Sequence, residues 1–117
     1  MVTPKIEQFL VAEKPETPCL IVDLDVVIEK FIQFQTAFPQ AEIFYAVKAN
    51  PAAPILEKLV ALGSKFDAAS IVEVECCMAA GAEAENISYG NTIKKLSDIS
   101  AAYSRGIRLF AFDSEED

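Results

Sequence analysis

The chain has 117 residues, about the size of one small domain, and 52% of them are hydrophobic. Ten Lys and Arg against eighteen Asp and Glu give a net charge of −8, which argues against nucleic acid or an anionic membrane as the main partner. No apolar run is long enough to span a membrane, and the first residues lack the basic start and apolar core of a signal peptide. We therefore expect a cytoplasmic protein.

The chain contains three cysteines, Cys19, Cys76 and Cys77, and no histidine. Their number is odd and their spacing is not that of a metal site. We expect reduced, mostly buried thiols and no bound metal.

The first 40 residues are expected to lead into the main fold. Residues 1–17 mix charges with prolines and predict a poorly patterned arm with no more than a short helical turn. Residues 19–22 are an apolar run that predicts a strand. At first sight, this strand would be a fifth one parallel to the four strands expected later in the chain. Acids at the start of residues 23–38 and an apolar residue every three or four positions predict a helix, which Pro39 ends. Residues 18–40 are thus a strand and a helix.

The next predicted strand has a lysine at its end. Residues 43–47 are apolar and favour a strand, and Lys48 follows them. Because side chains alternate along a strand, Ala46 and Lys48 are expected to share a face, with Lys48 at the C-terminal mouth. A partly desolvated lysine in that position is a candidate nucleophile for a carbonyl group. The alternative is a lysine that only marks where the strand meets solvent.

Strand and helix patterns then alternate to the end of the chain. The expected strands begin near 43, 65, 86 and 108, roughly every 22 residues, and such alternation predicts a parallel sheet in a (β/α) barrel or an open doubly wound fold. The chain stops at a helix start, and half a barrel leaves open edges, so we expect residues 41–117 to be the first half of an eight-stranded barrel within a longer protein. The expected elements are a helix from Asn50 or Pro51 to Gly63, a strand over 65–69, helices over 71–80 and 93–104, strands over 86–90 and 108–112, and a helix start at 113–116.

In both folds, ligands bind at the C-terminal ends of the strands. Each polar residue there has a second interpretation: Asn50 and Ser70 are possible helix caps, Glu73 is a possible partner in a capping box with Ser70, and Asp67 is a possible salt-bridge partner of Lys48. The sequence contains no glycine-rich phosphate loop, nucleophile elbow or metal cluster. The residues expected on this rim are Lys48, Asn50, Asp67, Ser70, Ser88, Gly90, Asn91, Asp113 and Ser114.

Several segments together resemble the N-terminal part of the pyridoxal-phosphate-dependent decarboxylases of alanine racemase-like fold. The resemblance runs from residue 17 to the end, with the segments in the same order and at matching spacing. It is strongest to ornithine decarboxylases, including those that also accept lysine. The segments are TPCLIVDLD (17–25), FYAVKANP (44–51), LGSKFDAAS (62–70), ISYGNTIKK (87–95) and LFAFDS (109–114).

The resemblance implies a pyridoxal 5'-phosphate site. It makes Lys48 the catalytic lysine that bonds to the cofactor aldehyde. It also places Ala46 close to the cofactor ring, and it makes Asp67 the acid near the cofactor and near Lys48. The residues that it implies as supporting or substrate-side positions are Asn50, Ser70 and Glu73. It also implies that the strand near residues 19–23 joins a separate β-domain.

The resemblance further implies that the whole protein is a homodimeric carboxy-lyase of polyamine biosynthesis. Ornithine, with lysine as a second substrate, is the amino acid expected to be converted to its diamine and carbon dioxide. In this family the phosphate-binding glycines lie later in the barrel and the catalytic cysteine lies in a C-terminal β-domain, so residues 1–117 alone are expected to be inactive. The alternatives are a non-catalytic cofactor-binding barrel, a decarboxylase-like regulatory protein or a purely structural half-barrel.

Overall fold

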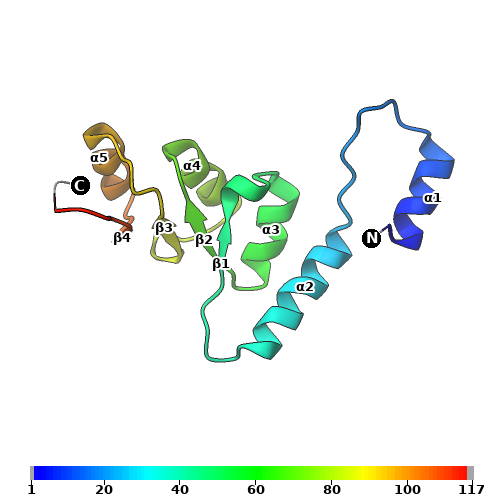
Figure 1. Ribbon diagram of the computed structural model, residues 1–117, viewed down its shortest axis with the longest axis horizontal. Helices are drawn as coiled ribbons and strands as arrows, with labels where there is room; N and C mark the ends of the chain where they lie inside the picture. Colours follow the sequence, from blue (N-terminus) through cyan, green and yellow to red (C-terminus); the bar gives the residue numbers. More distant parts are fainter. Residues whose placement is uncertain (1, 116–117) are drawn as a thin grey trace.

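The structure, a computed structural model, describes residues 2–115 of the chain. Its centre is one sheet of four parallel strands in chain order. Neighbours in the sheet are also neighbours in the chain, so a crossover joins each pair, and Figure 1 shows a helix in each crossover. The predicted parallel strand–helix order is therefore confirmed. The strands are β1 (Phe44–Ala46), β2 (Lys65–Ala68), β3 (Ile87–Tyr89) and β4 (Leu109–Phe110).

The core lies between one face of the sheet and the three crossover helices, and Phe31, from a helix that precedes the sheet, also belongs to it. Side chains alternate along β2, so Phe66 and Ala68 lie on the buried face and Asp67 on the opposite one. Leu109, on the same face as Asp67, is 55% exposed. The crossover helices are α3 (Ala53–Ala61), α4 (Ile71–Ala79) and α5 (Leu96–Ser104), and short 3-10 turns lie at η1 (Val47–Ala49) and η2 (Ala84–Asn86). The largest fully buried side chains are Tyr89, Phe66, Leu56, Ile87, Ile107, Val47, Val74 and Cys77.

Two further helices precede the sheet, α1 (Pro4–Glu13) and α2 (Leu24–Ala37). The helix predicted after residue 23 is confirmed as α2, but the expectation of no more than a helical turn before residue 17 is wrong. Thr3 caps α1 by accepting a hydrogen bond from the Ile6 amide (3.2 Å), and Lys14 ends it with a φ of 44°. No α1 residue is buried, but Ile6, Phe9 and Leu10 lie at helical spacing, a signal that the prediction missed.

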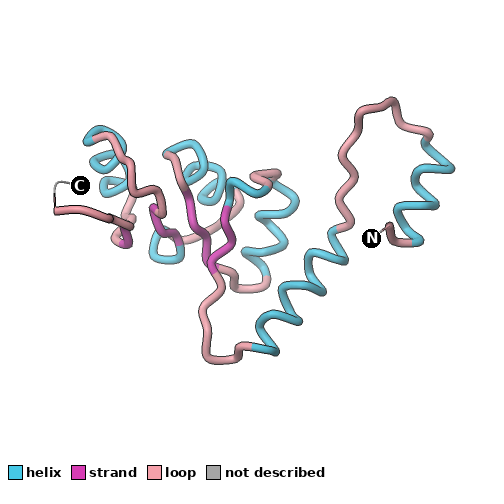
Figure 2. The backbone as a smooth tube through the Cα atoms, viewed as in Figure 1, coloured by secondary structure: helices cyan, strands magenta, loops and turns pink. Residues whose placement is uncertain are grey.

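The expectation that residues 19–22 add a fifth parallel strand to this sheet is wrong as well, and the implied pairing with a separate β-domain stays a prediction. This segment lies in an irregular connection between α1 and α2, drawn in pink in Figure 2, and it pairs with no strand of the described residues. A strand needs a neighbour for its backbone hydrogen bonds. Leu20 is 82% exposed, which is consistent with a segment that is not packed into the sheet.

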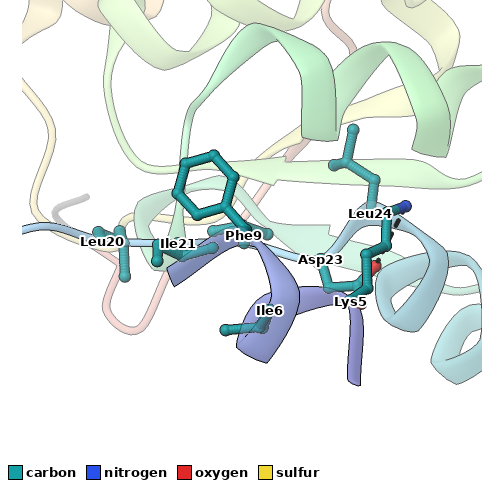
Figure 3. Close-up of a pocket in the computed structure, with 8 residues that line it drawn as sticks. Lys5, Ile6, Phe9, Leu20, Ile21, Asp23 and Leu24 are labelled. Carbon is teal, nitrogen blue, oxygen red and sulfur yellow. Dashed lines mark ion pairs between the residues drawn. The ribbon is translucent and has the colours of Figure 1, made fainter. Parts of the chain in front are cut away.

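The start of α1 is fastened to the start of α2. The Thr3 hydroxyl donates to Asp23 Oδ2 (2.7 Å), and Lys5 pairs with Asp25 (2.6 Å). Between α1 and residues 20–24 lies a groove of about 380 Å³, lined by Phe9 and Leu20 among others (Figure 3). No helix of residues 2–115 is long and apolar enough to cross a membrane.

Several element boundaries differ from the predicted ones. The helix expected from residue 50 or 51 begins at Ala53, because Pro54 lacks an amide hydrogen and is tolerated only in the first turn. The helix expected from residue 93 begins at Leu96. Residues 113–115 form a bend and a turn, and the rest of the helix start predicted over 113–116 lies outside the described residues.

Candidate functional site

Lys48 follows the C-terminal end of β1 but is not part of the strand. The strand ends at Ala46, and Val47–Ala49 form the 3-10 turn η1, so the alternation that was expected to put Ala46 and Lys48 on one face stops at Ala46. The Tyr45 hydroxyl donates to the Asn50 carbonyl across this turn (3.1 Å). Val47 is fully buried, so its apolar side chain packs into the core from a turn rather than from a strand.

The Lys48 amine reaches solvent. Lys48 is exposed, so the partial desolvation expected for it is not observed within residues 2–115. Over the same residues its ammonium group has no hydrogen bond or ion pair, and the salt bridge considered between Lys48 and Asp67 does not form. The chain thus presents an accessible primary amine directly beyond a strand.

Asp67 lies on β2 between two register partners. Ala46 of β1 is its neighbour on one side and Ser88 of β3 on the other. The Ser88 hydroxyl donates to Asp67 Oδ1 over 2.7 Å, and Ser88 itself is buried. The small Ala46 side chain leaves the sheet face beside the carboxylate open. The carboxylate is therefore fixed close to the strand end that precedes Lys48.

Gly90 follows β3 and lies against the same carboxylate. A Cβ atom at this position would be 2.0 Å from Asp67 Oδ1 and 2.5 Å from Oδ2. Ser88 and Gly90 were predicted at the rim from the sequence, but no relation between them and Asp67 was predicted. A constant register of 21 residues relates Ala46, Asp67 and Ser88, and this spacing is the signal that could have revealed the cluster.

The three supporting positions make hydrogen bonds to the backbone. Asn50 Oδ1 accepts from the Ala52 amide (3.1 Å) and does not cap α3. Ser70 Oγ accepts from the Glu73 amide (3.2 Å), and Glu73 Oε2 accepts from the Ala69 amide (2.7 Å). Ser70 therefore caps α4 as predicted, whereas Glu73 accepts from the amide of the residue before the cap rather than from that of Ser70, so the reciprocal bond of a capping box is not the one observed.

The loops of the rim are tied together. Asn91 Nδ2 donates to the carbonyl of Ala69 (3.4 Å), which links the loops after β3 and β2. The Lys94 amine donates to the carbonyl of Thr92 (3.0 Å) and to that of Ala111 (2.6 Å), which links the loops after β3 and β4. The Asn91 bond thus ties the loop after β2, the strand that carries Asp67, to the neighbouring loop.

A parallel strand–helix sheet with an amine and a carboxylate at its C-terminal rim defines the class as an α/β protein whose ligand site is expected at the strand ends. The family model described as "Pyridoxal-dependent decarboxylase, pyridoxal binding domain" matches residues 24–117, and the chain belongs to this family.

Curated relatives agree with this family. Mouse ornithine decarboxylase is 37% identical over 95 residues, which cover 81% of this chain and 21% of that protein. The lysine/ornithine decarboxylase of Selenomonas ruminantium is 38% identical over 102 residues, covering 87% and 26%. The chain therefore spans about a quarter of the length of these relatives.

Solved structures show the same fold. A lysine decarboxylase from Selenomonas ruminantium superposes with a TM-score of 0.84 at 36% identity, over 97% of this chain and 31% of that one. A lysine/ornithine decarboxylase from Vibrio vulnificus, complexed with putrescine, gives 0.86 at 27% identity over 99% and 32%. The predicted α/β fold, the first part of a (β/α)8 barrel, is confirmed.

Pyridoxal phosphate is the cofactor of this family, and the residues at the rim fit it. An exposed primary amine is the group that bonds to an aldehyde. The fixed Asp67 carboxylate supplies negative charge at the same rim, and the small Ala46 leaves room for a flat ring. The rim thus offers an amine directly after β1, an acid on β2 and a small side chain beside that acid.

Proposed function

We propose that the chain is the N-terminal part of a pyridoxal-phosphate-dependent amino-acid decarboxylase in which Lys48 is the cofactor lysine. The observation that carries this proposal is the exposed Lys48 amine directly after β1, at the same strand ends as the fixed Asp67 carboxylate. In a parallel sheet with this connectivity, those strand ends are where ligands bind.

Each residue of the proposed site has a separate role. Lys48 supplies the amine that holds the cofactor aldehyde, and its place on a short turn gives it more freedom to approach and withdraw than a strand would. Asp67 keeps a negative charge facing the rim, and Ala46 leaves space for the ring. Asn50, Ser70 and Glu73 support the site by shaping the loops after β1 and β2. When bound, the cofactor accepts the electron pair left on the substrate carbon as carbon dioxide departs.

We propose ornithine as the substrate of the whole enzyme, with lysine as an alternative, and a role in polyamine biosynthesis. Support comes from relatives named ornithine and lysine/ornithine decarboxylase, and from similar structures complexed with putrescine and cadaverine. A homodimer is part of the same proposal. So is a cytoplasmic location, which the free cysteines Cys19, Cys76 and Cys77 favour.

We also propose a division of the chain into three segments. Residues 1–17 form an N-terminal arm, residues 18–40 lead into the barrel, and residues 41–117 are the cofactor-binding part of it. The start of β1 at Phe44 supports the last boundary.

A second candidate function is a decarboxylase-like regulator without activity. It is favoured by one relative, named "Antizyme inhibitor 2" from Xenopus laevis, which is 37% identical over 95 residues. This candidate predicts that the full-length protein releases no carbon dioxide from ornithine or lysine.

The test is release of carbon dioxide by the full-length protein with added cofactor. The wild type is expected to act on ornithine, and Lys48→Ala is expected to lose at least about 1000-fold in turnover because the amine proposed to bond to the cofactor is removed. Lys58→Ala is the matched control, because Lys58 is an exposed lysine on α3 away from the strand ends. Normal turnover by Lys48→Ala would refute the proposed site, and an inactive wild type would favour the regulator.

A further inference from the structure

Two residues at and just after the end of β3, Ser88 and Gly90, hold the Asp67 carboxylate in place. They lie on either side of Tyr89. Ser88 is its register partner, and partners on neighbouring parallel strands lie side by side on one face. Gly90 follows two residues later, so it lies on the same side of the chain as Ser88. Both residues therefore face Asp67.

The hydroxyl of Ser88 is committed to the carboxylate. Its Oγ lies 2.7 Å from Asp67 Oδ1 and 3.4 Å from the Phe66 carbonyl oxygen. A serine hydroxyl has a single proton, and the shorter contact to a charged acceptor is the stronger hydrogen bond. Ser88 is 8% exposed, so water has little access to compete for that bond. Asp67 Oδ2 has no partner among residues 2–115, so one oxygen is fixed and the other is available.

Gly90 provides the space that this carboxylate occupies. Its missing Cβ would lie 2.0 Å from Asp67 Oδ1, well inside van der Waals contact. Unlike Gly63, Gly81 and Gly106, Gly90 does not have a positive φ, so its backbone conformation does not require glycine. The need for glycine here comes from Asp67. An alanine would be tolerated by the backbone and would push the carboxylate aside.

We propose that Ser88 and Gly90 are positioning residues for the Asp67 carboxylate: Ser88 holds it by a hydrogen bond, and Gly90 leaves the space in which it lies. This inference rests on the proposed function, in which Asp67 acts beside Lys48. Small displacements of a charged group at a reacting centre lower the rate while leaving substrate binding largely intact.

The test compares Ser88→Ala, Ser88→Thr and Gly90→Ala in the full-length enzyme. Ser88→Ala and Gly90→Ala are each expected to lower kcat about tenfold with little change in KM, and to alter the visible absorbance of the bound cofactor. Ser88→Thr keeps the hydroxyl and is expected to retain the wild-type kcat and the wild-type absorbance of the cofactor. Ser64→Ala is the matched control, since Ser64 is also buried but donates to the Lys65 carbonyl at the other end of β2 (2.8 Å).

Two further measurements separate a positioning role from a purely structural one. In crystal structures of the cofactor-free enzyme, the Asp67 carboxylate is expected to have moved in Ser88→Ala and Gly90→Ala. In an Asp67→Ala background, adding Gly90→Ala is expected to have no further effect on cofactor absorbance, because the colliding group is gone.

The inference is overturned if the Asp67 carboxylate keeps its place in both variants, or if both retain wild-type kcat and absorbance. It is also overturned if Gly90→Ala has its full effect in the Asp67→Ala background. If Lys48→Ala is inactive while Ser88→Ala and Gly90→Ala behave as wild type, only this inference fails. Normal turnover by Lys48→Ala instead refutes the proposed function.

Discussion

At the scale of single residues, the proposed site combines an exposed amine with a fixed carboxylate. Lys48 lies on a short turn, is exposed and is not paired within residues 2–115. Asp67 lies on a strand, accepts a hydrogen bond from Ser88 and abuts Gly90. An amine that exchanges between partners needs freedom, whereas a charge that stabilises it needs a constant place.

The buried thiol of Cys77 gives a test of the core at the same scale. Burial, then the neighbouring Cys76 and Glu73, raise the pKa of Cys77 from 9.0 to about 12. A raised pKa keeps the thiol protonated, and the thiol reacts far more slowly than the thiolate. In the folded full-length protein at about pH 8.5, we expect iodoacetamide to modify Cys77 at least roughly tenfold more slowly than the half-buried Cys76.

Peptide mapping by mass spectrometry measures both rates in the same sample. Denatured protein is the control, in which the two cysteines should react alike. Equal rates in the folded protein would contradict the burial of Cys77 between α4 and the sheet.

Single residues also show how far the sequence could predict the site. The apolar run before Lys48 correctly predicted burial, because Val47 is fully buried, but a buried turn and a buried strand leave the same pattern. Asp67 was placed on the rim, yet its partner Ser88 lies 21 residues away and no local pattern relates the two. That contact depends on strand register, which only the folded sheet fixes.

At the scale of elements, the start of α4 distinguishes a capping role from a role at the site. Ser70 accepts from the Glu73 amide, so Ser70→Ala is expected to lower the free energy of unfolding by about 1 kcal/mol. We expect turnover per folded molecule to fall no more than about threefold, because the hydroxyl is occupied by the cap. Urea unfolding and steady-state kinetics of the full-length protein measure the two effects.

Thr36→Ala is a suitable comparison, because the Thr36 hydroxyl donates to the Ile32 carbonyl on the exposed surface of α2 and caps no helix. A loss of turnover beyond about tenfold in Ser70→Ala, with unchanged stability, would assign Ser70 to the substrate rather than to the cap.

Elements whose apolar residues face the core were predicted well, and the others were not. Each of the four strands and of α2 to α5 carries at least one residue in the core or packed against it, and all were predicted in order. The helix α1 has no buried residue, and it depends on its Thr3 cap. The helix α5 begins at Leu96 rather than at residue 93. In the segment before it, the Lys94 amine donates to the carbonyls of Thr92 and Ala111, and Ala111 lies 17 residues away, so no local sequence pattern reveals this contact.

At the scale of the whole molecule, the described residues form the first four strands of the barrel and carry the part of the proposed site that lies on them. Helices bury one face of its sheet, and the strand registers place Asp67, Ser88 and the exposed Leu109 on the other. Figure 1 shows the crossover helices beside the sheet. The edges formed by β1 and β4 have no further strand within residues 2–115. In a closed barrel, the face that carries Asp67 would line the interior, and the rim beyond it would receive the cofactor.

The most direct test of this account identifies the lysine that holds the cofactor. The full-length protein is incubated with pyridoxal phosphate, reduced with borohydride, digested and mapped by mass spectrometry. The account predicts that the label is on the peptide containing Lys48, that it is lost in Lys48→Ala and that it is kept in Lys58→Ala. Label found mainly on any other lysine would contradict it.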